Sequence, residues 1–174
     1  MAKSFENTEL NRRLANMIQL GVVESVDLAT GTARVRIGEI VTADLPMRAD
    51  RAGRDRSWWP YEPGEQVCVF APSGNLSAGL IMGAVFSGFA PAPGDKAGLH
   101  RQVYGDGTVI EYDRDASHFR MHLGSGSAEI VAPAGISITG TVTVQGDVIA
   151  DGISLKGHVH GGIQRGGSDT DGPK

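Results

Sequence analysis

An alternating ladder near the C-terminus constrains this chain more than any other feature. Residues 136–148 read ISITGTVTVQGDV, so that aliphatic side chains alternate with Ser, Thr and Asp. Successive side chains of a strand point to opposite faces, which predicts a ribbon with one apolar face and one polar face. Such a ribbon is too thin to bury its apolar face alone, because isolated two-stranded elements are marginal and repeated elements must stack on neighbours. We therefore expect the ribbon to need other copies of itself.

Glycine supplies the turns of this C-terminal region. The chain has 25 glycines among 174 residues, a composition that favours turns and strands. Five of them follow one another at intervals of five or six residues, at positions 135, 140, 146, 152 and 157. This spacing is too short for an ordinary sandwich and favours a stacked, strand-rich needle. The apolar positions change parity near Asp151-Gly152 and again at Gly157, and we interpret both changes as corners.

A histidine pair follows the ladder, in the segment Gly157-His-Val-His-Gly-Gly162. Residues two apart on a strand share a face, so His158 and His160 can present two imidazoles in one direction. Imidazole suits Fe, Ni, Cu and Zn, which makes this pair the candidate metal site. The alternative is that the two are ordinary exposed polar residues. The other three histidines, at positions 100, 118 and 122, lack such a context and are left out of the site.

The N-terminal part is predicted to be a short amphipathic helix followed by a small barrel. Apolar residues at positions 10, 14, 17 and 18 share one helical face, with Asn7 or Thr8 as cap and Gly21 as the end. Stretches with a period of two follow, at residues 22–27, 33–37, 66–70 and 80–86. About five short strands in about 70 residues suit a barrel of the OB type.

A proline-glycine break at residues 89–94 separates this barrel from the rest. After it, residues 103–112 are predicted to form a hairpin, with Asp106-Gly107 as its turn. The chain is therefore divided into an N-terminal helix at 1–20, an OB-fold domain at 21–90, a linker and hairpin region at 91–127, and a spike with its apex at 128–174.

Composition excludes several classes of function. The formal net charge of −4 gives no general attraction to nucleic acid or acidic lipid. Cys68 is the single cysteine and lies in an apolar run, so we expect a buried thiol and neither a disulfide framework nor a cysteine-rich zinc site. The first residues form no apolar leader, which predicts synthesis in the cytoplasm without a signal peptide.

These residues resemble the baseplate assembly protein V, or central spike, of contractile phage tails and the related R-type bacteriocins. The resemblance covers nearly the whole chain, and its most specific mark is the terminal His-x-His-Gly-Gly. Its other marks are Gly21-Val-Val, Leu45-Pro46, Trp58-Trp59, Pro63-Gly-Glu-Gln-Val67, Pro72-Ser-Gly-Asn75, Gly79-Leu-Ile-Met-Gly83, Tyr104-Gly-Asp-Gly-Thr108 and Tyr112-Asp113.

The resemblance implies an all-β protein, with an OB-fold barrel after a short helix and a C-terminal needle in which three chains intertwine as a β-helix. It implies one metal ion per trimer, held at the tip by His158 and His160 of each chain. The ion is expected to be iron, with nickel or zinc as alternatives. Six imidazoles about one axis suit octahedral coordination rather than the tetrahedral geometry of structural zinc, and a closed shell is structural rather than catalytic.

The function implied is mechanical rather than enzymatic. Sheath contraction would drive the trimer into the host outer membrane, and the barrel would sit on the baseplate hub and tail tube proteins during assembly. The protein would be located at the tail tip of a virion or bacteriocin particle. Interwound chains leave no free sheet edge, which suits a needle that must not buckle.

Two other functions remain as alternatives. The first is an OB-fold protein that binds nucleic acid or oligosaccharide through the arginines at 48, 51, 54 and 56 and the tryptophans at 58 and 59. The acidic net charge disfavours it, and this loop is better suited to docking on a neighbouring tail protein. The second is a His-x-His metallohydrolase, but only Asp169 and Asp171 remain downstream as further ligands and no general base is placed nearby.

Overall fold

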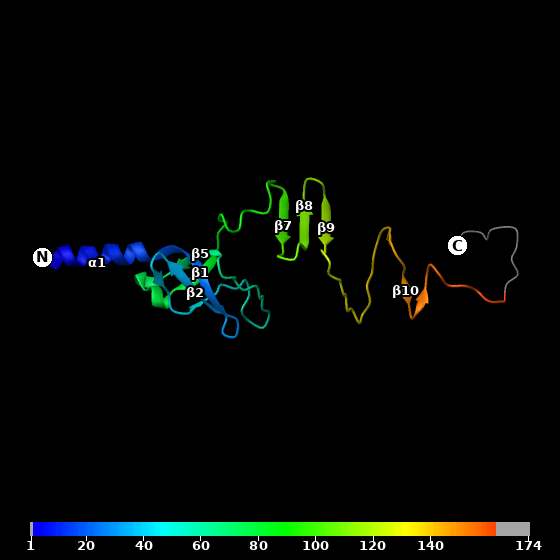
Figure 1. Ribbon diagram of the computed structural model, residues 1–174, viewed down its shortest axis with the longest axis horizontal. Helices are drawn as coiled ribbons and strands as arrows, with labels where there is room; N and C mark the ends of the chain where they lie inside the picture. The colour runs from blue at the N-terminus through cyan, green and yellow to red at the C-terminus, as the bar shows by residue number, and fades with distance from the viewer. Residues whose placement is uncertain (1, 163–174) are drawn as a thin grey trace. The chain divides into compact units, whose positions relative to one another are not determined.

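The computed structural model describes residues 2–162 (Figure 1). The chain divides into two compact units, one ending at Ala128 and the next beginning at Glu129. The described residues are mostly strands and loops with one α-helix, which confirms the prediction of a strand-rich chain with a short N-terminal helix. None of the helices within residues 2–162 is long and apolar enough to cross a bilayer.

Helix α1 (Ala2–Asn16) opens the chain. Asn7 and Thr8 lie inside it, so the predicted cap at either residue is wrong. The carboxylate of Glu9 pairs with Arg12 at 2.9 Å and with Arg13 at 2.7 Å, three and four residues further on. Ion pairs at these spacings stabilise a helix. Here they lie in the turn that directly follows the two predicted cap residues.

The barrel is one six-stranded antiparallel sheet in the order β3-β2-β1-β5-β6, with β4 also paired to β2. Ile81 of β6 forms a bridge with Met47, and its carbonyl accepts from Arg48 N at 3.1 Å. The chain after β4 therefore meets the last strand, and the sheet closes on itself as a small barrel does. The strands are β1 (Ile18–Asp27), β2 (Thr32–Ile37), β3 (Ile40–Val41), β4 (Leu45–Pro46), β5 (Gln66–Phe70) and β6 (Leu80–Ala84). Two single 3₁₀ turns, η1 (Pro72–Gly74) and η2 (Leu76–Ala78), connect β5 to β6.

The interior of the barrel is filled by small aliphatic side chains from alternate strand positions. Its fully buried members are Val23, Ala33, Val35, Leu45, Val67, Val69 and Ile81. Thr42 is buried among them and satisfied, because its hydroxyl accepts from Val35 N at 3.0 Å and donates to Ala43 O at 2.8 Å. Cys68 lies between Val67 and Val69 in β5, but its side chain is on the opposite face from these two buried valines. It is only partly buried, so the predicted buried thiol is wrong.

Gly21 was predicted to end the helix, and this is wrong. The helix ends at Asn16, and Gly21 lies within β1. A Cβ at this position would lie 2.5 Å from Val35 Cγ1 and 2.8 Å from the carbonyl oxygen of Arg36. Glycine is therefore required here by the close approach of β2 to β1, because any side chain would collide with the neighbouring strand.

A second sheet follows, made of β7 (Leu99–Val103), β8 (Val109–Asp113) and β9 (His118–His122) in that order. The predicted Asp106-Gly107 hairpin is confirmed: Gly107 has φ +83°, and Asp106 Oδ1 accepts from Thr108 N at 2.8 Å. Across the three strands, Glu111 pairs with Arg101 at 2.7 Å and with Arg120 at 3.5 Å.

In the second unit, residues 129–148 contain no strand paired with another described segment. The chain then forms one short hairpin, β10 (Ile149–Ala150) with β11 (Ile153–Ser154), drawn in orange in Figure 1. Its turn is Asp151-Gly152, with φ +51° and +81°, so the predicted corner there is a tight reversal. Glycines 135, 140 and 146 also adopt positive φ, as the turn interpretation requires.

Candidate functional site

The two predicted metal ligands lie together just after β11. The imidazole rings of His158 and His160 have centroids 5.1 Å apart and planes at 77° to each other. Both residues are exposed. The pair therefore forms a small imidazole surface at the end of the described chain.

Hydrogen bonds to backbone carbonyls determine which nitrogen of His158 can bind a metal. Its Nδ1 lies 3.1 Å from the carbonyl oxygen of Ser154 and 2.9 Å from that of Leu155. A carbonyl oxygen only accepts, so Nδ1 carries the hydrogen. In the neutral ring this leaves the lone pair on Nε2, the nitrogen that a metal would use.

Asp147 organises the hairpin that precedes the histidines. Its Oδ1 accepts from Val148 N at 2.8 Å and from Lys156 N at 3.0 Å, and its Oδ2 accepts from Ser154 Oγ. The hydrogen bond from Ser154 is the largest cause of a lowered pKa at Asp147, followed by that from Lys156 N. Sequence reasoning missed both Asp147 and Ser154, because nothing in their spacing of seven residues indicates a contact.

The donor set fits a metal that prefers nitrogen ligands, but one chain supplies only part of it. Within residues 2–162, no group of three or more His, Cys, Asp or Glu side chains is placed to hold a metal ion. His158 and His160 offer two imidazoles, whereas zinc sites use four protein ligands when structural and three when catalytic. A complete site would therefore need ligands in addition to those that residues 2–162 of one chain supply.

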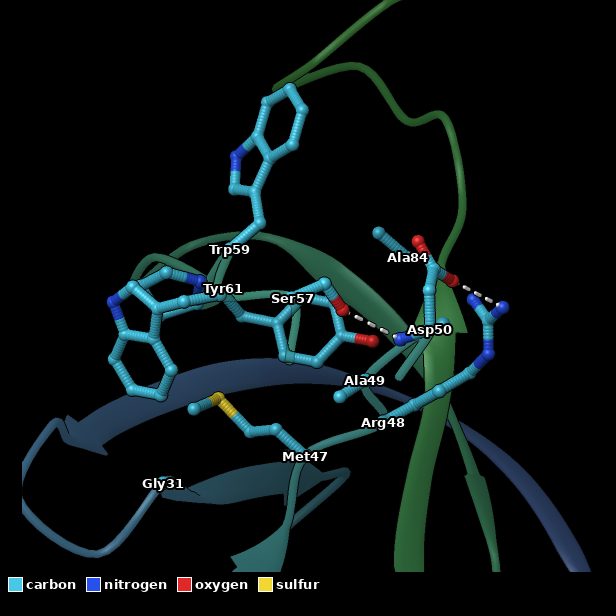
Figure 2. A pocket seen from close by; sticks show the side chains of 12 residues that line it. Gly31, Met47, Arg48, Ala49, Asp50, Ser57, Trp59, Tyr61 and Ala84 are labelled. Carbon is cyan, nitrogen blue, oxygen red and sulfur yellow. Dashed lines mark hydrogen bonds and ion pairs between the residues drawn. The ribbon is translucent and has the colours of Figure 1, made fainter. Parts of the chain in front are cut away.

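The basic loop of the barrel, residues 48–57, is the second candidate site (Figure 2). Two of its four arginines are already paired: Arg48 with Asp50 at 2.7 Å, and Arg51 with Asp55 at 3.2 Å. Ser57 Oγ accepts from the backbone N–H of Asp50 at 3.0 Å, which folds the loop back on itself. These contacts reduce the positive charge that the loop offers to a ligand.

The aromatic residues beside this loop line a cavity of about 340 Å³ with Met47 and Tyr61. Figure 2 shows Trp59 pointing away from Tyr61. Trp58 and Trp59 are 63% and 62% exposed, but Trp59 stacks on Tyr104 of the β7–β8 turn. One ring face of Trp59 is therefore occupied. Of the two tryptophans, only Trp58 has no ring stacked on it among the described residues, whereas single-strand binding stacks successive bases on several aromatic side chains.

Models of known protein families match two segments of the chain. A family model described as the type VI secretion system/phage-baseplate injector OB domain matches residues 19–86, which span all six strands of the barrel except the first residue of β1. A second, described as the GpV apex motif, matches residues 152–174 and includes His158 and His160. Together the two matches cover more than half of the 174 residues.

The chain is also similar to a curated protein, the spike protein of Escherichia phage P2. The two are 37% identical over 136 residues, which amount to 78% of this chain and 63% of the relative. The chain thus spans somewhat less than two thirds of that relative's length. With the injector OB domain, the apex motif and this similarity on one polypeptide, the chain belongs to the family of phage baseplate spike proteins.

Proposed function

We propose that this chain is the structural central spike of a contractile tail baseplate, a homotrimeric needle that punctures the host outer membrane and takes part in baseplate assembly. One observation carries the proposal: the aliphatic row of the ribbon is uncovered in the single chain. Ile136, Ile138 and Val142 are 61%, 66% and 61% exposed, and Val144 and Val148 are 49% and 41% exposed. A contiguous uncovered apolar row marks a surface that another chain covers.

Three copies around one axis would remove this exposure. The aliphatic rows of the three ribbons would form a dry axis, while Ser137, Thr139 and Thr141 face water. The backbone of residues 129–148, which pairs with no strand within residues 2–162, would gain a partner in the neighbouring chains. Pairing between chains closes every edge, and a needle without free edges resists unzipping under load.

The histidine pair would close the tip of this needle. Two histidines from each of three chains give six imidazole nitrogens, enough for one octahedral ion per trimer. We propose iron, with nickel or zinc as alternatives. A bound ion would cross-link three chain ends, and termini are poorly ordered unless they are tied down. The chain's own contribution is to present Nε2 of His158 with its lone pair free.

The barrel would supply the attachment. Its proposed partners are the baseplate hub and tail tube proteins, which place the spike at the tail tip of a virion or bacteriocin particle. Trp58 and the loop arginines are residue types that dominate protein interfaces, and they are exposed on the barrel. The proposed role involves neither catalysis nor nucleic acid, and the host outer membrane is the target.

The deciding experiment is the native mass of the full chain together with its metal content. We expect a particle of three times 18.3 kDa with about one transition metal ion per three chains. The double variant His158→Ala/His160→Ala should lose the metal. The control His100→Ala/His118→Ala removes two exposed imidazoles from β7 and β9 and should retain it. A metal-free monomer in the unmodified protein would refute the proposal.

A role in membrane puncture can be tested on assembled particles. Particles that carry the His158→Ala/His160→Ala variant should adsorb to host cells normally but release less cell content after contraction than unmodified particles. Particles that carry the His100→Ala/His118→Ala control should behave as unmodified ones. Equal release from all three would argue against a role of the apex in penetration.

A further inference from the structure

We infer that Asp147 and Ser154 are positioning residues of the apex: they hold the turn after β11 so that His158 keeps Nδ1 on the backbone and leaves Nε2 for a metal. The inference rests on the proposed function, because it concerns the same metal site. It adds two residues that the spacing of the histidines does not reveal.

The Asp147 carboxylate makes a contact across the β10–β11 hairpin. The β10–β11 pair joins only two residues on each side, and so short a two-stranded element is marginal by itself. Asp147 lies before β10 and Lys156 after β11, and the Asp147 carboxylate accepts from Lys156 N at 3.0 Å. Its other oxygen accepts from the hydroxyl of Ser154. The carboxylate thus ties both ends of the hairpin together.

The Ser154 side chain extends this contact toward His158. Ser154 Oγ also accepts from Gly157 N at 2.7 Å, so the hydroxyl links Asp147 to the residue just before His158. The carbonyl oxygen of the same serine accepts from His158 N at 3.0 Å and from its Nδ1 at 3.1 Å. Ser154 therefore contacts both the backbone and the ring of His158, and the carbonyl oxygen of Leu155, 2.9 Å from Nδ1, shares the contact with the ring.

Two further observations support a fixed turn. A Cβ at Gly157 would lie 3.1 Å from Ser154 Oγ, so a side chain here would displace the Ser154 hydroxyl by a few tenths of an ångström. The pKa of Asp147 is lowered, with the Ser154 hydroxyl as the first cause, which keeps the carboxylate in its accepting form. Hydrogen bonds that orient a ligating imidazole govern both its tautomer and its metal affinity.

The test compares four variants of the full chain with a matched control. Ser154→Ala and Asp147→Ala remove the contact, whereas Ser154→Thr keeps a hydroxyl and Asp147→Asn keeps one accepting oxygen. The control is Asp151→Asn, which removes a carboxylate from the same hairpin. Asp151 makes no hydrogen bond through its side chain within residues 2–162, and Asn tolerates its φ of +51°.

Two readouts are measured on each protein. The first is the ¹⁵N spectrum of the imidazoles in the metal-free chain, with His158→Ala to assign the signal; it reports which nitrogen carries the hydrogen. The second is Ni²⁺ affinity by competition with a chelator. We expect Ser154→Ala and Asp147→Ala to lose the Nδ1–H signature and to bind Ni²⁺ about 10- to 100-fold more weakly. Ser154→Thr and Asp151→Asn should match the unmodified protein, and Asp147→Asn should lie between.

The outcomes separate this inference from the proposed function. If the unmodified chain binds no Ni²⁺, the metal tip fails, and the imidazole spectra alone decide the role of Asp147 and Ser154. Unchanged spectra and affinity in Ser154→Ala and Asp147→Ala would overturn the inference while leaving the metal tip intact. A loss in Ser154→Ala that Ser154→Thr does not restore would overturn it too, because the hydroxyl is the group that the inference names.

Discussion

Trp59 stacks on Tyr104, with ring centroids 5.5 Å apart and ring planes within 5° of parallel. Trp59 lies between β4 and β5, and Tyr104 lies in the turn between β7 and β8. The contact therefore ties the barrel to the sheet that follows the proline-glycine break.

A double-mutant cycle on this pair should give a measurable coupling energy. Trp59→Ala and Tyr104→Ala together should cost less than the sum of the two single changes, by about 0.5–1.5 kcal/mol, because either change alone already removes the stack. The measurement is urea unfolding at one fixed protein concentration. Trp58→Ala is the matched control, since Trp58 has no stacking contact with Tyr104 among the described residues. Equal coupling for Trp58 would show that the stack is not the cause.

Gly21→Ala should destabilise the barrel. The added Cβ would lie 2.5 Å from Val35 Cγ1, in a core where Val35 is fully buried, and such overpacking typically costs about 1–3 kcal/mol. Gly83→Ala is the control within the same sheet, because an added Cβ there meets no atom within 4 Å. Urea unfolding of the two variants should separate them clearly, and similar stabilities would contradict the predicted collision.

A charge on the aliphatic row of the ribbon should prevent trimer formation. Ile138→Asp would place three like charges near the proposed axis, where they have no partner, whereas Thr139→Asp would place them on the polar face. Both side chains are exposed in the single chain, so neither change should affect the folding of the barrel. Sedimentation velocity should find monomers for Ile138→Asp and trimers for Thr139→Asp. Trimers for both would remove the axial assignment of Ile138.

The N-terminal helix should lose stability in acid. Hydrogen bonds from Arg12 and then Arg13 lower the pKa of Glu9 from 4.5 to about 2. A carboxyl whose pKa is lower in the folded state stabilises it above pH 4.5, and this contribution disappears as the pH falls from 4.5 toward 2. The amide signals of α1 in NMR spectra should follow this titration, and added salt should weaken it.

The matched variant for this titration is Glu9→Gln, which keeps the side-chain length but cannot ionise. Its α1 signals should be independent of pH over the same range. A titration that persists in Glu9→Gln would assign the acid sensitivity to another group.

Alternation along a strand is a local property, so the sequence was sufficient to predict it. Ala33 and Val35 are buried in β2 while Arg34 and Arg36 are exposed, as their period of two indicates. The Asp106-Gly107 turn is equally local, because its φ values and its side-chain hydrogen bond involve adjacent residues.

The predictions were wrong where contacts with a neighbouring strand determine the role or the burial of a residue. Gly21 was predicted to end a helix, but its role depends on Val35 and Arg36 across the strand pair. Cys68 belongs to an unbroken apolar run, yet only Val67 and Val69 point into the barrel. A run of apolar letters does not say which face of a strand is covered.

In the candidate site, too, local features were predicted from the sequence and contacts between distant residues were not. The spacing of His158 and His160 singled them out, and the structure places their rings together. Asp147 and Ser154 meet only because the chain reverses at Asp151-Gly152, and no pattern of residues predicts which polar groups such a reversal brings into contact.

Residues 129–148 pair with no strand within residues 2–162, and this has a consequence for biosynthesis. The barrel contains its own core and can fold as soon as it leaves the ribosome, since every strand that it needs has been translated. The ribbon emerges later and, on the proposed trimer, reaches its final form only when two sister chains arrive. The rate at which the ribbon assembles should therefore depend on the concentration of newly made chains. At low concentration, chains with folded barrels and unassembled ribbons should accumulate.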